Sequence, residues 1–279
     1  MAVADETAQM KVYSSELEIK SQELARTALQ LRNANTKLTQ LSVQKDAFLS
    51  QISHELRTPM SSIRAFSEIL RGVEVLSPQE QVRYASIIQE ETIRLTRLLD
   101  DLLDLSVLEN GQVSLNLSTG SLSDLMDHSV AMARVGRDAA AMQIHRNSAD
   151  ERIWLYTDLD RLNQVFLNLI VNAHKYCDAA EPKLQIIVRQ SAQQLTIDFI
   201  DNGTGISYEN QNLIFEKFSR IGGHKSGGAG LGLAISREIL QRLQGDVIYL
   251  PGQNGAAFRI RLPESVIGGA ARADMSSTD

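Results

Sequence analysis

The sequence predicts a helical hairpin that forms a dimeric four-helix bundle, preceded by a coiled coil and followed by an α+β sandwich. Three observations lead to this fold class. Leucines recur at intervals of seven in a stretch, 10–45, that contains neither proline nor glycine, which is typical of a coiled-coil helix. A second helical stripe of apolar residues follows at 78–109 after a short break. Beyond Gly111 the pattern changes to short strands and helices, as in a sheet covered by helices.

These changes of pattern divide the 279 residues into five segments. We predict a disordered N-terminus at 1–9, a coiled-coil signalling helix at 10–44, a helical hairpin at 45–112, an α+β sandwich at 113–264 and a flexible tail at 265–279. The two terminal segments are assigned from their small and polar residues, which seldom order a chain end.

The composition is that of a folded chain, with 43% hydrophobic and 22% charged residues. The net charge of −6 argues against a general nucleic-acid binder, which is more often basic. The chain has no run of about 18 apolar residues and no signal-peptide pattern, so we expect no membrane span and a cytoplasmic location. The single cysteine, Cys177, excludes an intramolecular disulfide and a cysteine-based zinc site.

The heptad repeat is carried by leucines of the first predicted helix. These are Leu17, Leu24, Leu31 and Leu38. The alternate core positions hold small or polar residues, among them Asn35, and an asparagine there can determine the register and the number of helices. We favour a dimeric coiled coil; the alternative is a long amphipathic helix that packs on its own domain.

A His-Glu pair lies further along the same helix. The apolar residues Phe48, Ile52 and Leu56 recur at helical spacing and define the buried face. At about 100° per residue, their mean direction lies roughly 195° from His54, so this side chain points to solvent. An exposed imidazole beside the carboxylate of Glu55 can act as a nucleophile, because the acid can orient the ring and accept its proton. Taken alone, the pair reads more simply as ordinary surface residues.

A hairpin is expected because a second helix begins a few residues after the first one ends. Pro59 should bend the first helix, and Gly72 is a plausible stop. Ser77 is expected to cap the second helix, with a proline at the first helical position and an acid in the first turn. Two antiparallel helices have too small a core alone, so two copies should form a four-helix bundle.

The second half is predicted to be a mixed or mostly antiparallel sheet with helices on one face. Strands are expected at 113–117, 150–156, 184–189, 195–201, 247–250 and 256–262. Helices are expected at 121–135, at 159–176 with Asp158 as the N-cap, and at 231–243. The segment 136–157 is otherwise hard to interpret.

Polar residues gather on one face of the predicted helix 159–176. Asn168, Asn172 and then Lys175 or Tyr176 follow one another at helical spacing. An amide oxygen is a hard ligand suited to magnesium, and lysine is a point charge suited to phosphate. An ordinary solvated face is the alternative, although the opposite face is strongly apolar.

Two glycine-containing segments follow. Asp201 ends a strand and precedes Gly203 and Gly205, which permit a tight turn and a close approach of the backbone to a ligand. The carboxylate could accept a hydrogen bond from an amine such as that of adenine; a plain turn is the alternative. The segment 222–232 is rich in glycine and leads into a helix, which favours phosphate binding through backbone N–H groups. It has no Gly-Lys-Ser/Thr sequence and is not a Walker-type loop.

In this order, these segments resemble the catalytic core of bacterial sensor histidine kinases of the two-component type, over residues 40–264. The matching blocks are the phosphoacceptor block 48–59, the asparagine block 168–176, the acid-glycine block 201–205, the Phe-Glu-Lys-Phe block 215–218 and the glycine lid ending at 228–233. The resemblance implies that 45–112 is a dimerisation and histidine phosphotransfer domain. It also implies that 113–264 is a catalytic ATP-binding domain of the gyrase type.

The resemblance further implies an ATP-dependent protein histidine kinase that phosphorylates His54, with Glu55 as the general base. Asn172 corresponds to the ligand of Mg²⁺, and Asn168 to its helper. The other positions at the nucleotide are the adenine-reading acid Asp201, its neighbours Gly203 and Gly205, Lys175, Tyr176, and the lid residues Gly228, Gly230, Leu231 and Gly232. One departure is Thr204, at a position where proline is frequent.

The resemblance implies a homodimer that passes the phosphoryl group to an aspartate in the receiver domain of a response regulator. Thr58 lies one helical turn after His54, where a threonine helps relatives to position the water that dephosphorylates the regulator. Two other readings stay open. One is a dimeric adaptor that keeps the fold without turning over ATP, and the other is a related ATPase or serine kinase without a phosphohistidine.

Overall fold

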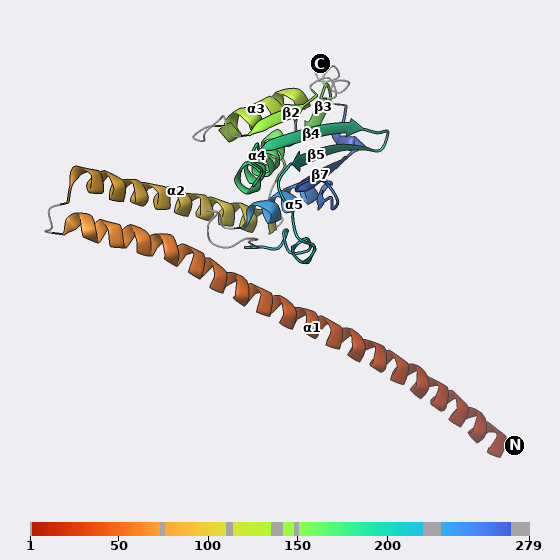
Figure 1. Cartoon of the computed structure of the whole chain (residues 1–279). Coiled ribbons are helices and arrows are strands. Elements are labelled where there is room, and N and C mark those ends of the chain that lie inside the picture. The colour runs from red at the N-terminus through yellow and green to blue at the C-terminus, as the bar shows by residue number, and fades with distance from the viewer. Residues whose placement is uncertain are drawn as a thin grey trace, which may run out of the picture. The chain divides into compact units, whose positions relative to one another are not determined.

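The computed structural model describes residues 2–72, 76–109, 114–134, 142–147, 151–219 and 230–268; side chains are described from residue 20, except those of 41 and 44. The chain divides into two units, Met1–Arg57 and Thr58–Asp279. Figure 1 shows the elements along the chain, most of them labelled.

The first helix, α1, runs from Ala2 to Arg71. The expectation of a disordered segment at 1–9 is therefore wrong from residue 2 onward. Alanine, glutamate and glutamine are good helix formers, and extending a helix costs far less than starting one. The helix also continues through Pro59, and the bend expected there stays a prediction. Within the described residues, no helix has a stretch long and apolar enough to cross a membrane.

The heptad leucines of α1 that the structure describes are strongly exposed in the single chain. The exposed fractions are 73% for Leu24, 71% for Leu31 and 65% for Leu38. A row of large apolar side chains in water is unfavourable unless it is covered by a partner. These three leucines therefore give no support to the alternative of an amphipathic helix that packs on its own domain. The dimeric coiled coil stays a prediction.

The second helix, α2, spans Pro78–Glu109, as the apolar stripe predicts. Its start is a reciprocal capping box. The Ser77 backbone N–H donates to Glu80 Oε2 at 2.8 Å, and the Glu80 backbone N–H donates to Ser77 Oγ at 3.3 Å. The rings of Phe66 on α1 and Tyr84 on α2 stack at 5.4 Å between centroids, which joins the two arms of the hairpin.

The remaining described residues form strands and helices that cover one another in layers (Figure 1). The strands are β1 Ser118–Ser121, β2 Gln143–Arg146, β3 Trp154–Thr157, β4 Lys183–Gln190, β5 Gln194–Asp201, β6 Asp246–Tyr249 and β7 Ala257–Pro263. The helices are α3 Leu122–Arg134, α4 Leu159–Tyr176 and α5 Gly232–Arg242, with short 3₁₀ turns at Tyr208–Asn210 and Glu264–Val266.

In the described part of the chain, the main sheet has the strand order β2-β4-β5-β7-β6, and β1 pairs with β3 in a separate two-stranded sheet. Among the described strand pairs, only β2–β4 is parallel. The sheet is therefore mixed, as predicted. On β5, the alternate residues Leu195, Ile197 and Phe199 are buried against the helices, and the Phe199 ring lies 5.7 Å from that of Phe166 on α4.

The start of the sandwich differs from the prediction. Residues 114–117 form no strand, and the strand β1 begins at Ser118. The Asn116 N–H donates instead to Asp158 Oδ2 at 3.0 Å, so the segment is held by the N-cap of α4 rather than by a sheet ladder. Position 113 lies outside the described residues. The sequence also missed β2, because four residues of mixed polarity carry too little periodicity to identify a strand.

The chain beyond β7 is ordered further than predicted. Val266, within the tail assigned to 265–279, is buried with 5% of its surface exposed. Ile267 forms an isolated antiparallel bridge with Leu155, and the Gly268 N–H donates to the Trp154 carbonyl at 3.1 Å. The expected loose tail is therefore wrong for 265–268, and the rest of it lies outside the described residues.

The C-terminal half of α2 contacts α4 and α5. Asp104 accepts hydrogen bonds from Arg161 Nη1 at 3.0 Å and from Gln164 Nε2 at 2.8 Å. The Arg242 guanidinium donates to the carbonyl of Leu108. Helix α2 is thus joined to the sandwich by charge-assisted hydrogen bonds, and its apolar residues Leu105 and Leu108 are buried.

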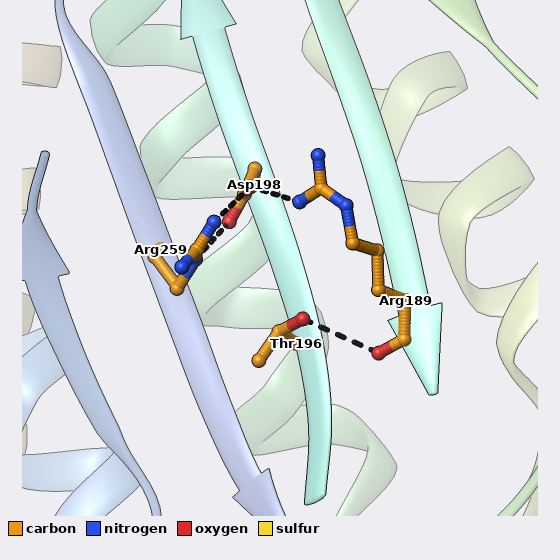
Figure 2. A network of polar contacts seen from close by, with 4 residues as sticks. All are labelled: Arg189, Thr196, Asp198 and Arg259. Atoms are coloured by element: carbon orange, nitrogen blue, oxygen red, sulfur yellow. Dashed lines mark hydrogen bonds and ion pairs between the residues drawn. The ribbon is translucent and has the colours of Figure 1, made fainter. Parts of the chain in front are cut away.

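A buried carboxylate on β5 is held between two arginines on the neighbouring strands (Figure 2). Asp198, whose side chain is 2% exposed, accepts from Arg259 Nε at 2.6 Å and from Arg189 Nη1 at 2.6 Å. Burial by itself raises the pKa of Asp198, but the hydrogen bonds from Arg259 and Arg189 outweigh it and leave the pKa below its ordinary value.

Replacing Asp198 with asparagine is expected to lower the free energy of unfolding by about 1–3 kcal/mol at neutral pH, because three charge-assisted hydrogen bonds from two arginines lose their anion. A carboxyl whose folded pKa is lowered stabilises the fold above its unfolded pKa, and this contribution is lost as pH falls through the folded pKa. Urea unfolding should therefore show a difference in the free energy of unfolding between the wild type and Asp198→Asn, and this difference should become smaller in acid. Glu264→Gln, at an exposed position after the same strand as Arg259, is the control; an equal loss there would contradict the assignment.

Candidate functional site

The polar residues predicted on α4 lie along the edge that its apolar face leaves uncovered. The apolar face is fully buried and consists of Leu162, Val165, Phe166, Leu169 and Ile170. Asn168 Nδ2 donates to Ser236 Oγ on α5 at 2.8 Å, and Asn172 Nδ2 donates to Asn168 Oδ1 at 3.4 Å. This chain of amides is anchored to α5 at one end, and it holds the side chain of Asn172 in a defined direction.

Lys175 and Tyr176 end the same helix and interact with each other. Lys175 Nζ lies 3.1 Å from Tyr176 Oη and 4.8 Å from the centre of its ring. The Tyr176 side chain is 49% exposed. The pair therefore presents a positive charge and an aromatic face at the end of α4, and both can contact an anionic ligand that carries a planar base.

The N-terminus of α5 lies against Asn168. A Cβ on Gly232 would lie 2.2 Å from Asn168 Oδ1, so only glycine permits this approach. The preceding residue, Leu231, is buried with no exposed surface and anchors the start of the helix. The first N–H groups of a helix and the positive end of its dipole favour an anion at such a position. The predicted residues Asn168, Leu231 and Gly232 are thus brought together.

Asp201 is buried at the end of β5, with 7% of its surface exposed. Its Oδ1 accepts from the backbone N–H groups of Gly203 and Ala256, each at 2.9 Å. Burial raises the pKa of Asp201; the two backbone hydrogen bonds oppose the rise, and the nearby charge of Asp178 adds to it. Because both backbone bonds use Oδ1, Oδ2 is the oxygen placed to accept a hydrogen bond from a ligand.

Two glycines of the predicted site have backbone conformations that favour glycine. Gly205 has φ +76° and Gly230 has φ +71°. A Cβ on Gly205 would lie 3.1 Å from the Gly255 carbonyl oxygen, and one on Gly230 would lie 2.7 Å from that of Ser219. Gly230 therefore packs against the backbone of Phe218 and Ser219, at the end of the Phe-Glu-Lys-Phe block. Gly228 and the rest of 220–229 lie outside the described residues.

The Phe-Glu-Lys-Phe block is attached to the sandwich through Phe215. Its ring meets the ring of Phe258 on β7 edge to face at 6.4 Å, and the Arg237 guanidinium lies 5.2 Å above it. These contacts link the segment before the glycine lid to both β7 and α5.

The predicted phosphoacceptor lies in the first unit. His54 is exposed, as the helical periodicity predicts, whereas Glu55 is buried with 8% of its surface exposed. Thr58 is exposed and is the first residue of the second unit. The burial of Glu55 did not follow from the sequence, because the residue lies at the border between the apolar and polar faces of the helix.

The residues present fit a magnesium ion held together with a phosphate-bearing ligand. In the described part of the chain, no group of three or more His, Cys, Asp or Glu side chains is arranged so that it could hold a metal ion. A cation here would need a different donor set. The amide oxygen of Asn172, with Asn168 beside it, is the hard oxygen ligand that magnesium accepts when phosphates supply the other positions.

Sequence reasoning missed several residues of the site. Asp178 and Asn202 bind the loops around Asp201, Ser236 anchors Asn168, and the Tyr249 hydroxyl accepts from the Ile206 N–H at 3.3 Å. Polar residues in loops have no periodicity that would distinguish them from solvated positions. Only their neighbours in space identify them.

Two protein families match separate parts of the chain. Residues 44–111 match the His Kinase A (phospho-acceptor) domain. Residues 157–266 match the family described as Histidine kinase-, DNA gyrase B-, and HSP90-like ATPase. The first match covers the helical hairpin with His54, and the second covers α4, the main sheet from β4 onward and α5.

Similar curated relatives carry the names of sensor kinases. The sensor protein kinase WalK of Staphylococcus haemolyticus is 34% identical over 247 residues, which are 83% of this chain and 39% of the relative. A sensor-like histidine kinase, ycf26, of Porphyra purpurea is 31% identical over 242 residues, which are 80% of this chain and 36% of the relative. The chain thus spans less than two-fifths of the length of either relative.

Solved structures of histidine kinases are also similar. The Acinetobacter baumannii histidine kinase AdeS has a TM-score of 0.59 at 26% identity, over 75% of this chain and 97% of that chain. The histidine kinase ThkA, in complex with the response regulator protein TrrA, has a TM-score of 0.61 over 78% of this chain and 61% of that chain. Its identity is 20%, so this second likeness shows the fold alone.

Proposed function

This chain belongs to the sensor histidine kinases of two-component systems, and from that membership we propose that it autophosphorylates with ATP. The bond from the γ-phosphorus to the bridging oxygen breaks, a bond to an imidazole nitrogen of His54 forms, and ADP leaves. The observation that carries the proposal is the convergence of α4, the end of β5 and the start of α5, with amides, a buried carboxylate and a helix N-terminus. These groups suit magnesium, adenine and phosphates respectively.

In this proposal, each part of the nucleotide meets residues of suitable chemistry. Asp201 Oδ2 accepts a hydrogen bond from the adenine amine, while Gly203 and Gly205 shape the pocket. Lys175 and Tyr176 contact the nucleotide at the end of α4. Gly230, Leu231 and Gly232, at the start of α5, are the proposed contacts of the phosphates, and the same role for Gly228 stays a prediction outside the described residues. Asn172, helped by Asn168, would hold magnesium, which would neutralise phosphate charge.

We propose that Glu55 is the general base that receives the imidazole proton of His54. The exposed His54 next to a buried carboxylate supports this assignment, because an acid held by its surroundings can orient the ring at little entropic cost. Phosphoryl transfer needs positioning and charge neutralisation more than covalent help, which suits the chemistry of these residues.

The proposed active form is a homodimer. The match of residues 44–111 to the phospho-acceptor domain supports a four-helix bundle made from two hairpins. The exposed heptad leucines of α1 support a coiled coil that precedes this bundle. The proposed acceptor of the phosphoryl group is an aspartate in the receiver domain of a response regulator. The similar kinase ThkA is seen in complex with a response regulator protein. We expect this to take place in the cytoplasm.

The decisive experiment is incubation of the protein with magnesium and γ-labelled ATP. A phosphoramidate on histidine is labile in acid and stable in base, so the expected label is lost at low pH and retained at high pH. No label would favour the dimeric adaptor that keeps the fold without turnover. A label stable in acid would favour the related serine kinase.

We also propose a phosphatase activity on the phosphorylated regulator, in which the Thr58 hydroxyl positions the attacking water. Thr58→Ala is expected to slow dephosphorylation of the regulator about 10-fold or more, since a positioned hydrogen bond is lost in the transition state. Labelling of His54 should change little. Release of phosphate from a purified phosphorylated receiver domain measures the first effect. Thr96→Ala on the exposed face of α2 is the control, and unchanged dephosphorylation in Thr58→Ala would remove this role.

A further inference from the structure

The loop that follows α4 is joined to the loop that follows Asp201 by a carboxylate. Asp178 Oδ1 accepts from the Thr204 backbone N–H at 2.8 Å, and its Oδ2 accepts from Thr204 Oγ1 at 3.0 Å. These bonds hold the pKa of Asp178 below its ordinary value, the backbone N–H being the larger cause. One carboxylate therefore binds both donors of a single threonine, and we name this pair the Asp178–Thr204 clasp.

The side chain of Asn202, in the loop after Asp201, also bonds to the segment that follows α4. Its Oδ1 accepts from the Lys183 backbone N–H at 2.7 Å and from Cys177 Sγ at 3.3 Å, and its Nδ2 donates to the Glu181 carbonyl at 2.9 Å. The segment 177–183 is thus bound to the loop after Asp201 at both of its ends.

The two loops also pack closely. A Cβ on Gly203 would lie 2.9 Å from Asp178 Oδ1 and 3.2 Å from Cys177 Cα. On its other side, the loop is held by the Ile206 N–H, which donates to Tyr249 Oη at 3.3 Å. The Gly203 N–H, which donates to Asp201 Oδ1 at 2.9 Å, lies within this clamped segment. The clasp therefore holds the segment that carries one of the two backbone N–H groups bonded to Asp201 Oδ1; the other comes from Ala256.

We propose that Asp178 and Thr204 are positioning residues for nucleotide binding, which act by holding the loop 202–205 so that Asp201 Oδ2 is aimed at the adenine amine. The inference rests on the proposed function, in which ATP binds beside Asp201. A proline at position 204 would have neither a backbone N–H nor a hydroxyl and could not form these two hydrogen bonds. The clasp therefore depends on the threonine at this position.

The clasp also places a negative charge near Asp201, and that charge contributes to the raised pKa of Asp201 after the larger effect of burial. The Tyr249 hydroxyl, from β6, is the titratable group on the other side of the loop. Ionised Asp201 is the form that accepts a hydrogen bond from an amine. Nucleotide affinity should therefore fall as pH drops through the pKa of Asp201, and removing the Asp178 charge should move this fall to lower pH.

The test is calorimetric titration of the whole chain with ADP and magnesium. Thr204→Pro, which removes both donors, is expected to weaken ADP affinity about three- to tenfold; Thr204→Val, which removes the hydroxyl alone, should weaken it about twofold. Thr204→Ser restores both donors and should bind as the wild type does. If Thr204→Pro does not fold, the Thr204→Val and Thr204→Ser pair decides the point.

Asp178→Asn separates charge from hydrogen bonding, because an amide can still accept the Thr204 N–H and donate to its hydroxyl. Its ADP affinity should match the wild type near neutral pH and fall at a lower pH than in the wild type. Glu209→Gln, an exposed acid beyond the loop, should leave the pH profile unchanged. If Thr204→Pro, Thr204→Val and Asp178→Asn all kept the ADP affinity and the pH profile of the wild type, this inference would be wrong, but the proposed function would stand. Absence of ADP binding by the wild type would overturn the proposed function and this inference together.

Discussion

Replacing His54 with glutamine is expected to abolish labelling by γ-labelled ATP, with a loss of roughly a thousandfold or more, because an amide nitrogen is not a nucleophile. Glutamine keeps the helical propensity and much of the size of the side chain. His54 is exposed, so the change should alter the free energy of unfolding by no more than about 0.5 kcal/mol. Loss of label with retained stability separates a chemical role from a structural one.

The matched control for this experiment is His145→Gln. His145 is also exposed, on β2 within the sandwich, and its replacement should leave the label intact. Calorimetry with ADP and magnesium should give equal affinity for wild type and His54→Gln, since the nucleotide site is unchanged. An acid-labile label that persisted in His54→Gln would place the phosphohistidine elsewhere. A label that persisted and resisted acid would favour the serine kinase reading.

Replacing Asp201 with asparagine is expected to weaken ADP affinity about 10- to 100-fold. The asparagine oxygen must still accept the N–H groups of Gly203 and Ala256, which now bond to Asp201 Oδ1 at 2.9 Å. The amide nitrogen then occupies the place of Oδ2 and presents a donor to the adenine amine, which is also a donor. Two opposed donors in a buried site cost more than the simple loss of one hydrogen bond.

The informative control is Asp198→Asn, three residues earlier on the same strand. Asp198 is also a buried carboxylate, but it is bonded to Arg189 and Arg259 on the neighbouring strands (Figure 2). Its replacement should lower stability and leave ADP affinity unchanged, whereas Asp201→Asn should lower affinity. Equal affinity in the wild type and Asp201→Asn would exclude Asp201 as the acid that recognises adenine.

Much of the helical architecture was predictable because helices carry their own signals. The limits of α2 and α4 follow from a 3.6-residue apolar stripe and from the caps Ser77 and Asp158. The exposure of His54 follows from the same periodicity. These features depend on residues within four positions of one another, so the sequence contains nearly all of the information.

The sheet was less predictable because its pairing joins residues far apart in the chain. The segment 114–117 has the alternating pattern of a strand. It is nevertheless held by the N-cap of α4, because the Asn116 N–H donates to Asp158. Strand β2 pairs in parallel with β4, forty residues later. A short strand is selected by its partners rather than by its own composition, so neither outcome could be derived locally.

The sequence by itself determined which chemical groups the chain offers for the proposed reaction: the histidine with its acid, the amides of α4, the carboxylate at the end of β5 and the glycines that lead into α5. Their identity and order are properties of the chain and need no coordinates. Only the tertiary structure decided which of them meet, as Gly232 meets Asn168, and which unremarked residues hold them, as Asp178 holds Thr204. The physical reason is that hydrogen bonds and close contacts act over a few ångströms in space, whereas the residues that form them are 26 to 68 positions apart.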